Sequence, residues 1–168
     1  MAPDILQKSF QWQSRSPEAT RALAAALGKL LAPGEVLALR GDLGSGKTEF
    51  VHGLARGLGV DPDVPVASPS FTLVHEYPGP LPLVHIDLYR LENIPPEMLP
   101  DLEEYLSGNR VTAVEWAERL GSLLPRDYLE VEIEVTGEDT REFFIRGHGP
   151  RGEELEQRLA QVIEAGEF

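Results

Sequence analysis

The sequence predicts an α/β protein in three layers, in which a mainly parallel sheet lies between helices and an antiparallel hairpin follows near the C-terminus. Two patterns predict this arrangement. Apolar runs without polar alternation, such as residues 36–39, are interspersed with segments of helical periodicity, and a glycine-rich loop over residues 41–48 connects a strand to a helix. The chain has 168 residues, of which 42% are hydrophobic. This is enough for one core, so we expect a single domain over residues 1–168.

The first expected helix covers residues 17–31. Ser16 is suited to accept a hydrogen bond as the N-cap, and Pro17 fits the first helical position because its missing N–H would have no intrahelical partner there. The short stretch before this helix contains Phe10 and Trp12, and we assign it to neither a helix nor a strand.

The remaining elements are predicted from apolar periodicity and from the positions of Gly and Pro. Two runs of alternating polarity flank the turn Gly-Glu-Asp-Thr at residues 137–140 and predict the antiparallel hairpin. The expected strands are residues 36–39, 71–77, 83–89, 111–116, 129–135 and 141–146, and the expected helices are residues 49–58, a short helix that ends the irregular span 94–106, and residues 153–165.

The glycine-rich loop reads Gly-Asp-Leu-Gly-Ser-Gly-Lys-Thr, which matches the phosphate-binding pattern G-x-x-x-x-G-K-[ST] at every fixed position. Glycines allow such a loop to turn tightly and to direct backbone N–H groups toward an anion at the positive end of the following helix. We expect Lys47 to reach the β- and γ-phosphates and the Thr48 hydroxyl to bind magnesium. The sequence therefore predicts a P-loop NTPase-like protein that binds ATP with Mg²⁺. The predicted nucleotide-binding residues are Gly41, Asp42, Leu43, Gly44, Ser45, Gly46, Lys47, Thr48 and Glu49.

Two carboxylates at the ends of apolar strands are the expected catalytic groups and, together with Thr48, the expected metal ligands. Asp87 ends the run Leu-Val-His-Ile-Asp, and Glu115 ends the run Val-Thr-Ala-Val-Glu. Ligands of an open α/β sheet bind at the carboxyl ends of its strands, and a magnesium-bound triphosphate would balance the charge of buried acids. The alternative is that each acid caps its strand or pairs with an arginine such as Arg90.

His85 and Trp116 lie next to these acids in the sequence. His85 is two residues before Asp87 and therefore on the same strand face, where it either hydrogen-bonds within the site or serves as a structural histidine. Trp116 follows Glu115 and would point to the opposite face. Core packing and a role in positioning Glu115 or a partner are both open for Trp116.

The composition excludes several classes of protein. The net charge is −13, from 28 acidic and 15 basic residues. Such a surface repels phosphate backbones, and no cluster of Lys and Arg with interleaved aromatic residues offsets it, so independent binding to nucleic acid is not expected. The chain has no cysteine, which excludes disulfides and thiolate zinc sites. We recognise no signal peptide or membrane span, and we expect a cytoplasmic setting without a membrane partner.

Four ordered motifs together resemble the TsaE (YjeE) family of small bacterial ATPases of tRNA threonylcarbamoyladenosine synthesis. They are the glycine-rich loop, Ser-Pro-Ser-Phe-Thr-Leu-Val-His-Glu-Tyr at 68–77, His-Ile-Asp-Leu-Tyr-Arg at 85–90 and Glu-Trp at 115–116. The resemblance covers about residues 16–116. It implies an ATPase that acts on a complex of the TsaB and TsaD proteins and that affects tRNA only indirectly, through this complex.

The resemblance also implies roles for single residues. Lys47 and Thr48 would bind phosphate and magnesium. Asp87 and Glu115 would supply the carboxylates for the metal and the water. Ser70 would lie in a switch-like loop that faces the nucleotide.

The chain departs from the family pattern at two positions. The family usually has Thr where this chain has Glu49, so the Glu49 carboxylate must point away from the phosphates or lower the affinity for them. The usual Ser-Pro-Thr is Ser-Pro-Ser here, which keeps the hydroxyl of Ser70 and loses a methyl group.

Two other functions stay open at this point. A small-molecule kinase of similar size would share the glycine-rich loop, but such enzymes usually need an arginine-bearing lid, and no arginine-rich segment of this kind follows Thr48. A non-enzymatic module that binds nucleotide to stabilise a complex would not need the acids Asp87 and Glu115.

Overall fold

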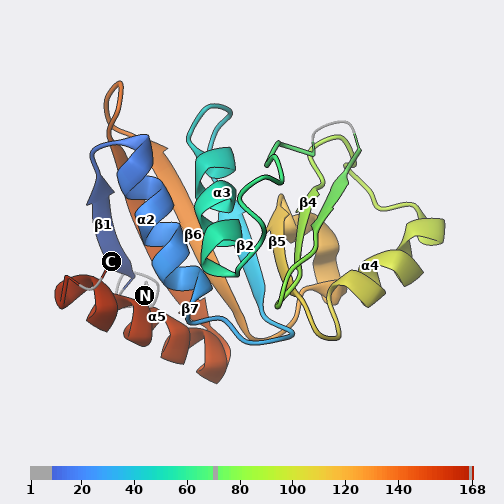
Figure 1. Cartoon of the computed structure of the whole chain (residues 1–168). Coiled ribbons are helices and arrows are strands. Elements are labelled where there is room, and N and C mark those ends of the chain that lie inside the picture. The colour runs from blue at the N-terminus through green and yellow to red at the C-terminus, as the bar shows by residue number, and fades with distance from the viewer. Residues whose placement is uncertain (1–8, 70–71, 167) are drawn as a thin grey trace, which may run out of the picture.

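Residues 9–69, 72–166 and 168 are described by a computed structural model, shown in Figure 1. These residues form a mixed α/β structure around a seven-stranded sheet with the strand order β1-β7-β6-β2-β5-β4-β3. The strands are β1 (Phe10–Ser14), β2 (Val36–Arg40), β3 (Val74–Tyr77), β4 (Leu83–Asp87), β5 (Val111–Glu115), β6 (Tyr128–Val135) and β7 (Arg141–His148).

The four central strands run parallel in the order β6-β2-β5-β4. Apolar runs predicted β2, β5 and β4, whereas β6 was expected only as a strand of the hairpin. Antiparallel strands lie on both sides of them, because β7 and β1 extend the sheet beyond β6 and β3 pairs with β4. The β6–β7 pair is the predicted C-terminal hairpin. The sheet, expected to be mainly parallel, is therefore parallel at its centre and antiparallel at both margins.

Helices α2 (Pro17–Gly28), α3 (Lys47–Gly57) and α5 (Gly149–Glu164) contribute to one buried cluster on one face of the sheet (Figure 1). Helices α2 and α3 approach each other closely because Gly53 faces the backbone of Arg21. A Cβ at Gly53 would lie 2.3 Å from the Arg21 carbonyl oxygen. This contact places α3, and with it the glycine-rich loop at the start of α3. No helix in the described part of the chain is both long and apolar enough to cross a membrane.

Shorter elements cover the other face over β2, β5 and β4. They are the 3₁₀ turns η1 (Pro96–Met98) and η2 (Ala117–Leu123) and the helix α4 (Leu99–Tyr105). The second buried cluster, which lies between them and the sheet, consists of Val36, Ala38, Val84, Ile86, Leu88, Leu102, Val114, Ala117 and Leu120. Helical elements therefore cover both faces of the central strands, as the predicted three layers require.

Several elements differ from those expected. The unassigned N-terminal stretch is strand β1, which pairs with β7, and the Trp12 ring centroid lies 6.0 Å from that of Phe143. Strand β5 ends one residue early because Trp116 has a left-handed backbone, with φ of +63°, and precedes the unexpected turn η2. Strand β4 ends at Asp87 rather than at residue 89. Strand β3 begins at Val74, because Leu73 has a left-handed backbone with φ of +69°, and residue 71 of the expected strand 71–77 lies outside the described residues. The helix boundaries also shift, since α2 ends at residue 28 rather than 31, α3 begins at residue 47 rather than 49, and α5 begins at residue 149 rather than 153.

Candidate functional site

The loop between β2 and α3 forms a cradle of backbone N–H groups. Gly41, Gly44 and Gly46 have φ of +153°, +81° and +110°, which residues with a Cβ rarely adopt. A Cβ on Gly41 would also lie 2.5 Å from the Ser45 hydroxyl oxygen. Gly46 is the N-cap of α3, and no side chain of the described residues caps this helix end. The first N–H groups of α3 are therefore available to an anion.

A cavity of about 860 Å³ opens at this cradle and reaches the carboxyl ends of β2, β4 and β5. Its volume lies within the range of roughly 300–1,000 Å³ that is typical of small-molecule sites. Ser45 does not line the cavity, because its side chain is buried. The other predicted site residues all line it: Gly41, Asp42, Leu43, Gly44, Gly46, Lys47, Thr48, Glu49, Asp87 and Glu115.

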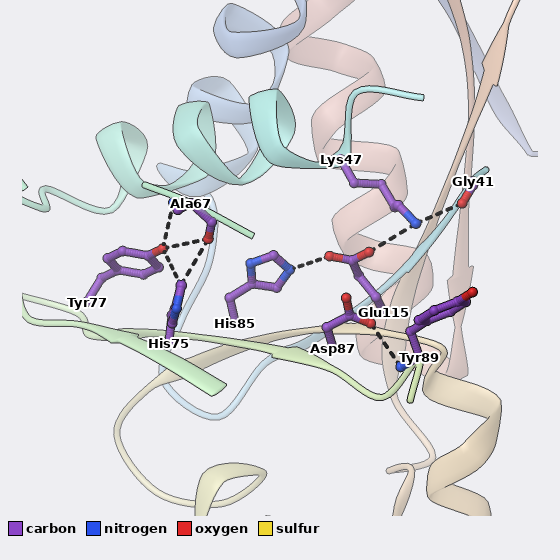
Figure 2. A network of polar contacts seen from close by, with 9 residues as sticks. All are labelled: Gly41, Lys47, Ala67, His75, Tyr77, His85, Asp87, Tyr89 and Glu115. Carbon is purple, nitrogen blue, oxygen red and sulfur yellow. Dashed lines mark hydrogen bonds and ion pairs between the residues drawn. The ribbon is translucent and has the colours of Figure 1, made fainter. Parts of the chain in front are cut away.

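Lys47, Glu115 and His85 form a chain of polar contacts beside the cavity (Figure 2). Lys47 Nζ donates to the Gly41 carbonyl oxygen at 2.8 Å and lies 3.0 Å from Glu115 Oε1. His85 Nε2 lies 2.7 Å from Glu115 Oε2. Both oxygens of this buried carboxylate therefore have a partner, which is the condition under which a protein tolerates a buried charge.

Asp87 lies beside Glu115 because the two residues are register partners in the β4–β5 pair. Its Oδ1 accepts a hydrogen bond from the backbone N–H of Tyr89 at 3.0 Å, so Asp87 does cap the end of its strand (Figure 2). Burial raises the pKa of Asp87 and the charge of Glu115 adds to this effect, although the Tyr89 N–H opposes it. Burial would also raise the pKa of Glu115, but hydrogen bonds and charges from His85 and Lys47 outweigh it and lower this pKa. The two acids are thus shifted in opposite directions, and Glu115 is the one held ionised.

The structure shows where the Glu49 carboxylate lies, but it does not test the expectation for Ser70. The Glu49 carboxylate accepts a hydrogen bond from Arg21 Nη1 at 2.8 Å. Its charge is thus neutralised by helix α2, while its backbone N–H belongs to the first turn of α3. Ser70, which was expected in a switch-like loop, lies outside the described residues. Ser68 from the same motif lines the cavity.

Trp116 lines the cavity and also packs against the second buried cluster, on the strand face that was expected for it. Its ring centroid lies 5.7 Å from that of Tyr89 and 4.4 Å from the guanidinium carbon of Arg119. Arg119 also donates to the carbonyl oxygen of Leu88 at 2.8 Å. These contacts connect the residue after Glu115 to the end of strand β4.

Arg141 is a site residue that the sequence patterns did not indicate. It begins β7, yet its Nε donates to the Ser45 carbonyl oxygen at 2.8 Å and its Nη2 to that of Gly44 at 3.4 Å. Its Nη1 donates to carbonyl oxygens of the hairpin turn, including that of Gly137 at 3.0 Å. Arg141 therefore joins the glycine-rich loop to the β6–β7 turn. No sequence motif marks it, because the loop lies 96 residues earlier in the chain.

Comparisons with known proteins agree with this architecture. The family model described as threonylcarbamoyl adenosine biosynthesis protein TsaE matches residues 14–143. The tRNA threonylcarbamoyladenosine biosynthesis protein TsaE of Bacillus subtilis is 41% identical over 155 residues, which cover 92% of this chain and 96% of that protein. The protein of the same name from Treponema pallidum is 38% identical over 132 residues, covering 79% of this chain and 96% of its own length. The crystal structure of YdiB from Bacillus subtilis matches with a TM-score of 0.75 and 37% identity, over 93% of this chain and 97% of that one. The chain therefore belongs to the TsaE family.

Proposed function

We propose that this chain is the ATP-binding and ATP-hydrolysing subunit of the machinery that makes threonylcarbamoyladenosine in tRNA. One observation carries the proposal: Lys47, at the end of the glycine cradle, lies 3.0 Å from the buried carboxylate of Glu115 on a neighbouring strand. Nucleotide hydrolysis on a phosphate-binding loop needs such a cation for the phosphates and such a carboxylate for the water. A single P-loop NTPase-like domain over residues 1–168 is part of the proposal.

The residues at the site suit a magnesium-bound nucleotide. Mg²⁺ is usually held by one or two protein oxygens and completes its shell with phosphate and water oxygens. Within the described residues, no three His, Asp or Glu side chains form a metal site by themselves. The Thr48 hydroxyl and the carboxylates of Asp87 and Glu115 would provide the protein ligands. When bound, the ion would neutralise phosphate charge.

Each side chain has a distinct task in this proposal. The N–H groups of the cradle and Lys47 bind the phosphates, because both present positive charge to the same part of the cavity. Glu115 orients the attacking water and accepts its proton, and its lowered pKa keeps it in the ionised form that this task requires. The protein carries out hydrolysis mainly by positioning and by charge.

The names of the relatives support a place in tRNA modification, and the charge of the chain indicates how it takes part. With a net charge of −13, the chain is expected to bind tRNA weakly by itself. We therefore propose that TsaB and TsaD provide the contact with tRNA in the cytoplasm, and that this chain supplies ATP-dependent switching to their complex.

Lys47→Ala tests this proposal against Lys29→Ala, which removes an exposed lysine at the end of α2. ATP binding by calorimetry, ATP hydrolysis with and without TsaB and TsaD, and multiple-turnover tRNA modification are measured. We expect Lys47→Ala to lose about 2–4 kcal/mol of ATP binding and to abolish multiple-turnover modification. Lys29→Ala should match the parent protein in each assay.

The other possible functions are outcomes of the same experiment. A phosphorylated small molecule would indicate a kinase. Full modification with the Lys47→Ala variant, or modification that needs ATP binding without hydrolysis, would contradict the ATPase role. A gel shift of tRNA by this chain alone at nanomolar concentration would contradict the division of tasks with TsaB and TsaD.

A further inference from the structure

His85 is a fully buried histidine on strand β4. Its Nε2 lies 2.7 Å from Glu115 Oε2, while its Nδ1 has no hydrogen-bond partner among the described residues. Its neighbours Val84 and Ile86 are also buried. An apolar side chain at this position would fill the space without leaving a polar atom unpaired, so packing alone does not account for a histidine here.

The contact defines which nitrogen of His85 carries the proton. The Glu115 carboxylate only accepts hydrogen bonds, so Nε2 of His85 must carry the hydrogen. His85 therefore donates to Glu115 through Nε2.

The two oxygens of Glu115 have partners that differ in mobility. Lys47 has a flexible side chain and, under the proposed function, leaves Oε1 to bind the triphosphate. His85 is fixed in the sheet by its strand and by complete burial. We infer that His85 is a positioning residue, which holds Oε2 of Glu115 so that Oε1 faces the attacking water while Lys47 is engaged with phosphate. This inference rests on the proposed ATPase function.

The effect of such positioning is on the rate rather than on nucleotide affinity. Without the His85 N–H, the Glu115 carboxylate can rotate once Lys47 has left, and a misplacement of about 1 Å can cost on the order of 100-fold in rate. Among the described residues, the His85 side chain makes no hydrogen bond to the glycine-rich loop. The affinity for ATP should therefore depend little on this side chain.

Two variants of His85 separate positioning from packing. Gln can place an amide N–H near the position of Nε2, whereas Leu has a similar volume and no donor. We expect His85→Leu to lower kcat about 30-fold with the Kd for ATP within about threefold, and His85→Gln to retain at least about one third of kcat. A packing role predicts the reverse order, because Gln buries unpaired amide atoms and Leu does not. That order, or parent-like turnover in His85→Leu, would overturn the inference.

The chain offers a matched control in its second His–Glu pair. His148 Nε2 lies 3.0 Å from Glu130 Oε1 where β7 ends, and neither residue lines the cavity. We expect His148→Leu to leave kcat and Kd for ATP unchanged.

Nitrogen-15 NMR of the His85 side chain gives a readout that does not depend on hydrolysis. We expect a protonated Nε2 in the nucleotide-free protein, retained when magnesium and a non-hydrolysable ATP analogue are added, and a shifted signal in Glu115→Ala. An unprotonated Nε2, or loss of the signature when the analogue binds, would overturn the inference. A parent protein that binds no ATP refutes the proposed function instead, and the nucleotide-free spectrum then shows whether the contact with Glu115 exists.

Discussion

Glu115→Gln is expected to separate ATP binding from hydrolysis. Lys47 Nζ lies 3.0 Å from Glu115 Oε1. At an effective dielectric constant of about 20, two unit charges at this distance attract each other by about 5 kcal/mol. The desolvation of both groups offsets most of this attraction. A net interaction energy of about 1–2 kcal/mol is therefore lost when Lys47 leaves Glu115 to bind a phosphate. Removing the carboxylate charge should therefore tighten ATP binding by about 5- to 30-fold.

The same substitution should lower kcat by about 100-fold or more, because the amide cannot accept the proton of the attacking water. Calorimetry with and without Mg²⁺ measures the affinity, and single-turnover hydrolysis measures the chemical step. Glu118→Gln removes one charge from another acid of the cavity lining and is the control. Weaker binding of Mg-ATP with unchanged binding of metal-free ATP would show that the loss of Glu115 as a metal ligand outweighs the release of Lys47, and would refute the predicted gain in affinity. Retained turnover would refute the catalytic role.

Three further substitutions test other parts of the structure. Asp87→Asn should weaken magnesium-dependent ATP binding. It should also remove the pH dependence of this binding, because burial raises the pKa of Asp87 in the parent protein and a proton there displaces the metal as pH falls. A parent-like magnesium titration would exclude Asp87 from the site. Arg141→Ala should weaken ATP binding about tenfold in calorimetry because the loop loses two hydrogen bonds; unchanged affinity would show that the loop holds its shape alone. Gly53→Ala should lower the free energy of unfolding, measured by urea denaturation, by about 2 kcal/mol. Gly79→Ala, where a Cβ would make ordinary contacts, should lower it less. Equal losses would contradict the close helix contact.

The centre of the fold could be predicted because its signals are local. Continuous apolar runs mark the parallel strands β2, β4 and β5, which are covered on both faces. The margins of the sheet lack such signals. Strand β1 alternates in burial along five residues, and only its pairing with β7, more than a hundred residues later, makes it a strand. Pairings of this kind depend on tertiary contact, which a sequence pattern does not contain.

The candidate site likewise has residues whose position could be predicted from the sequence and residues whose position could not. Lys47, Asp87 and Glu115 could be predicted to meet, because the carboxyl ends of parallel strands and the loop after β2 share one edge of the sheet. Arg141 could not, because its side chain reaches the loop only through the register of the β6–β7 hairpin. Trp116 packs against the second buried cluster, as strand periodicity predicts, but its contact with the cavity could not be predicted, because the strand ends at Glu115 and Trp116 has a φ of +63°.

Under the proposed function, the ion pair between Lys47 and Glu115 explains how a partner complex could control hydrolysis. In the structure, Lys47 and Glu115 neutralise each other, so neither the cation for the phosphate nor the carboxylate for the water is free. ATP must separate them, and the net attraction of about 1–2 kcal/mol lost in doing so keeps part of the population in the paired arrangement. A partner that binds the separated arrangement more tightly shifts this population without adding a catalytic group. We therefore expect TsaB and TsaD to stimulate hydrolysis by Glu118→Gln as much as they stimulate the parent protein. In Glu115→Gln, they should no longer change the affinity for ATP.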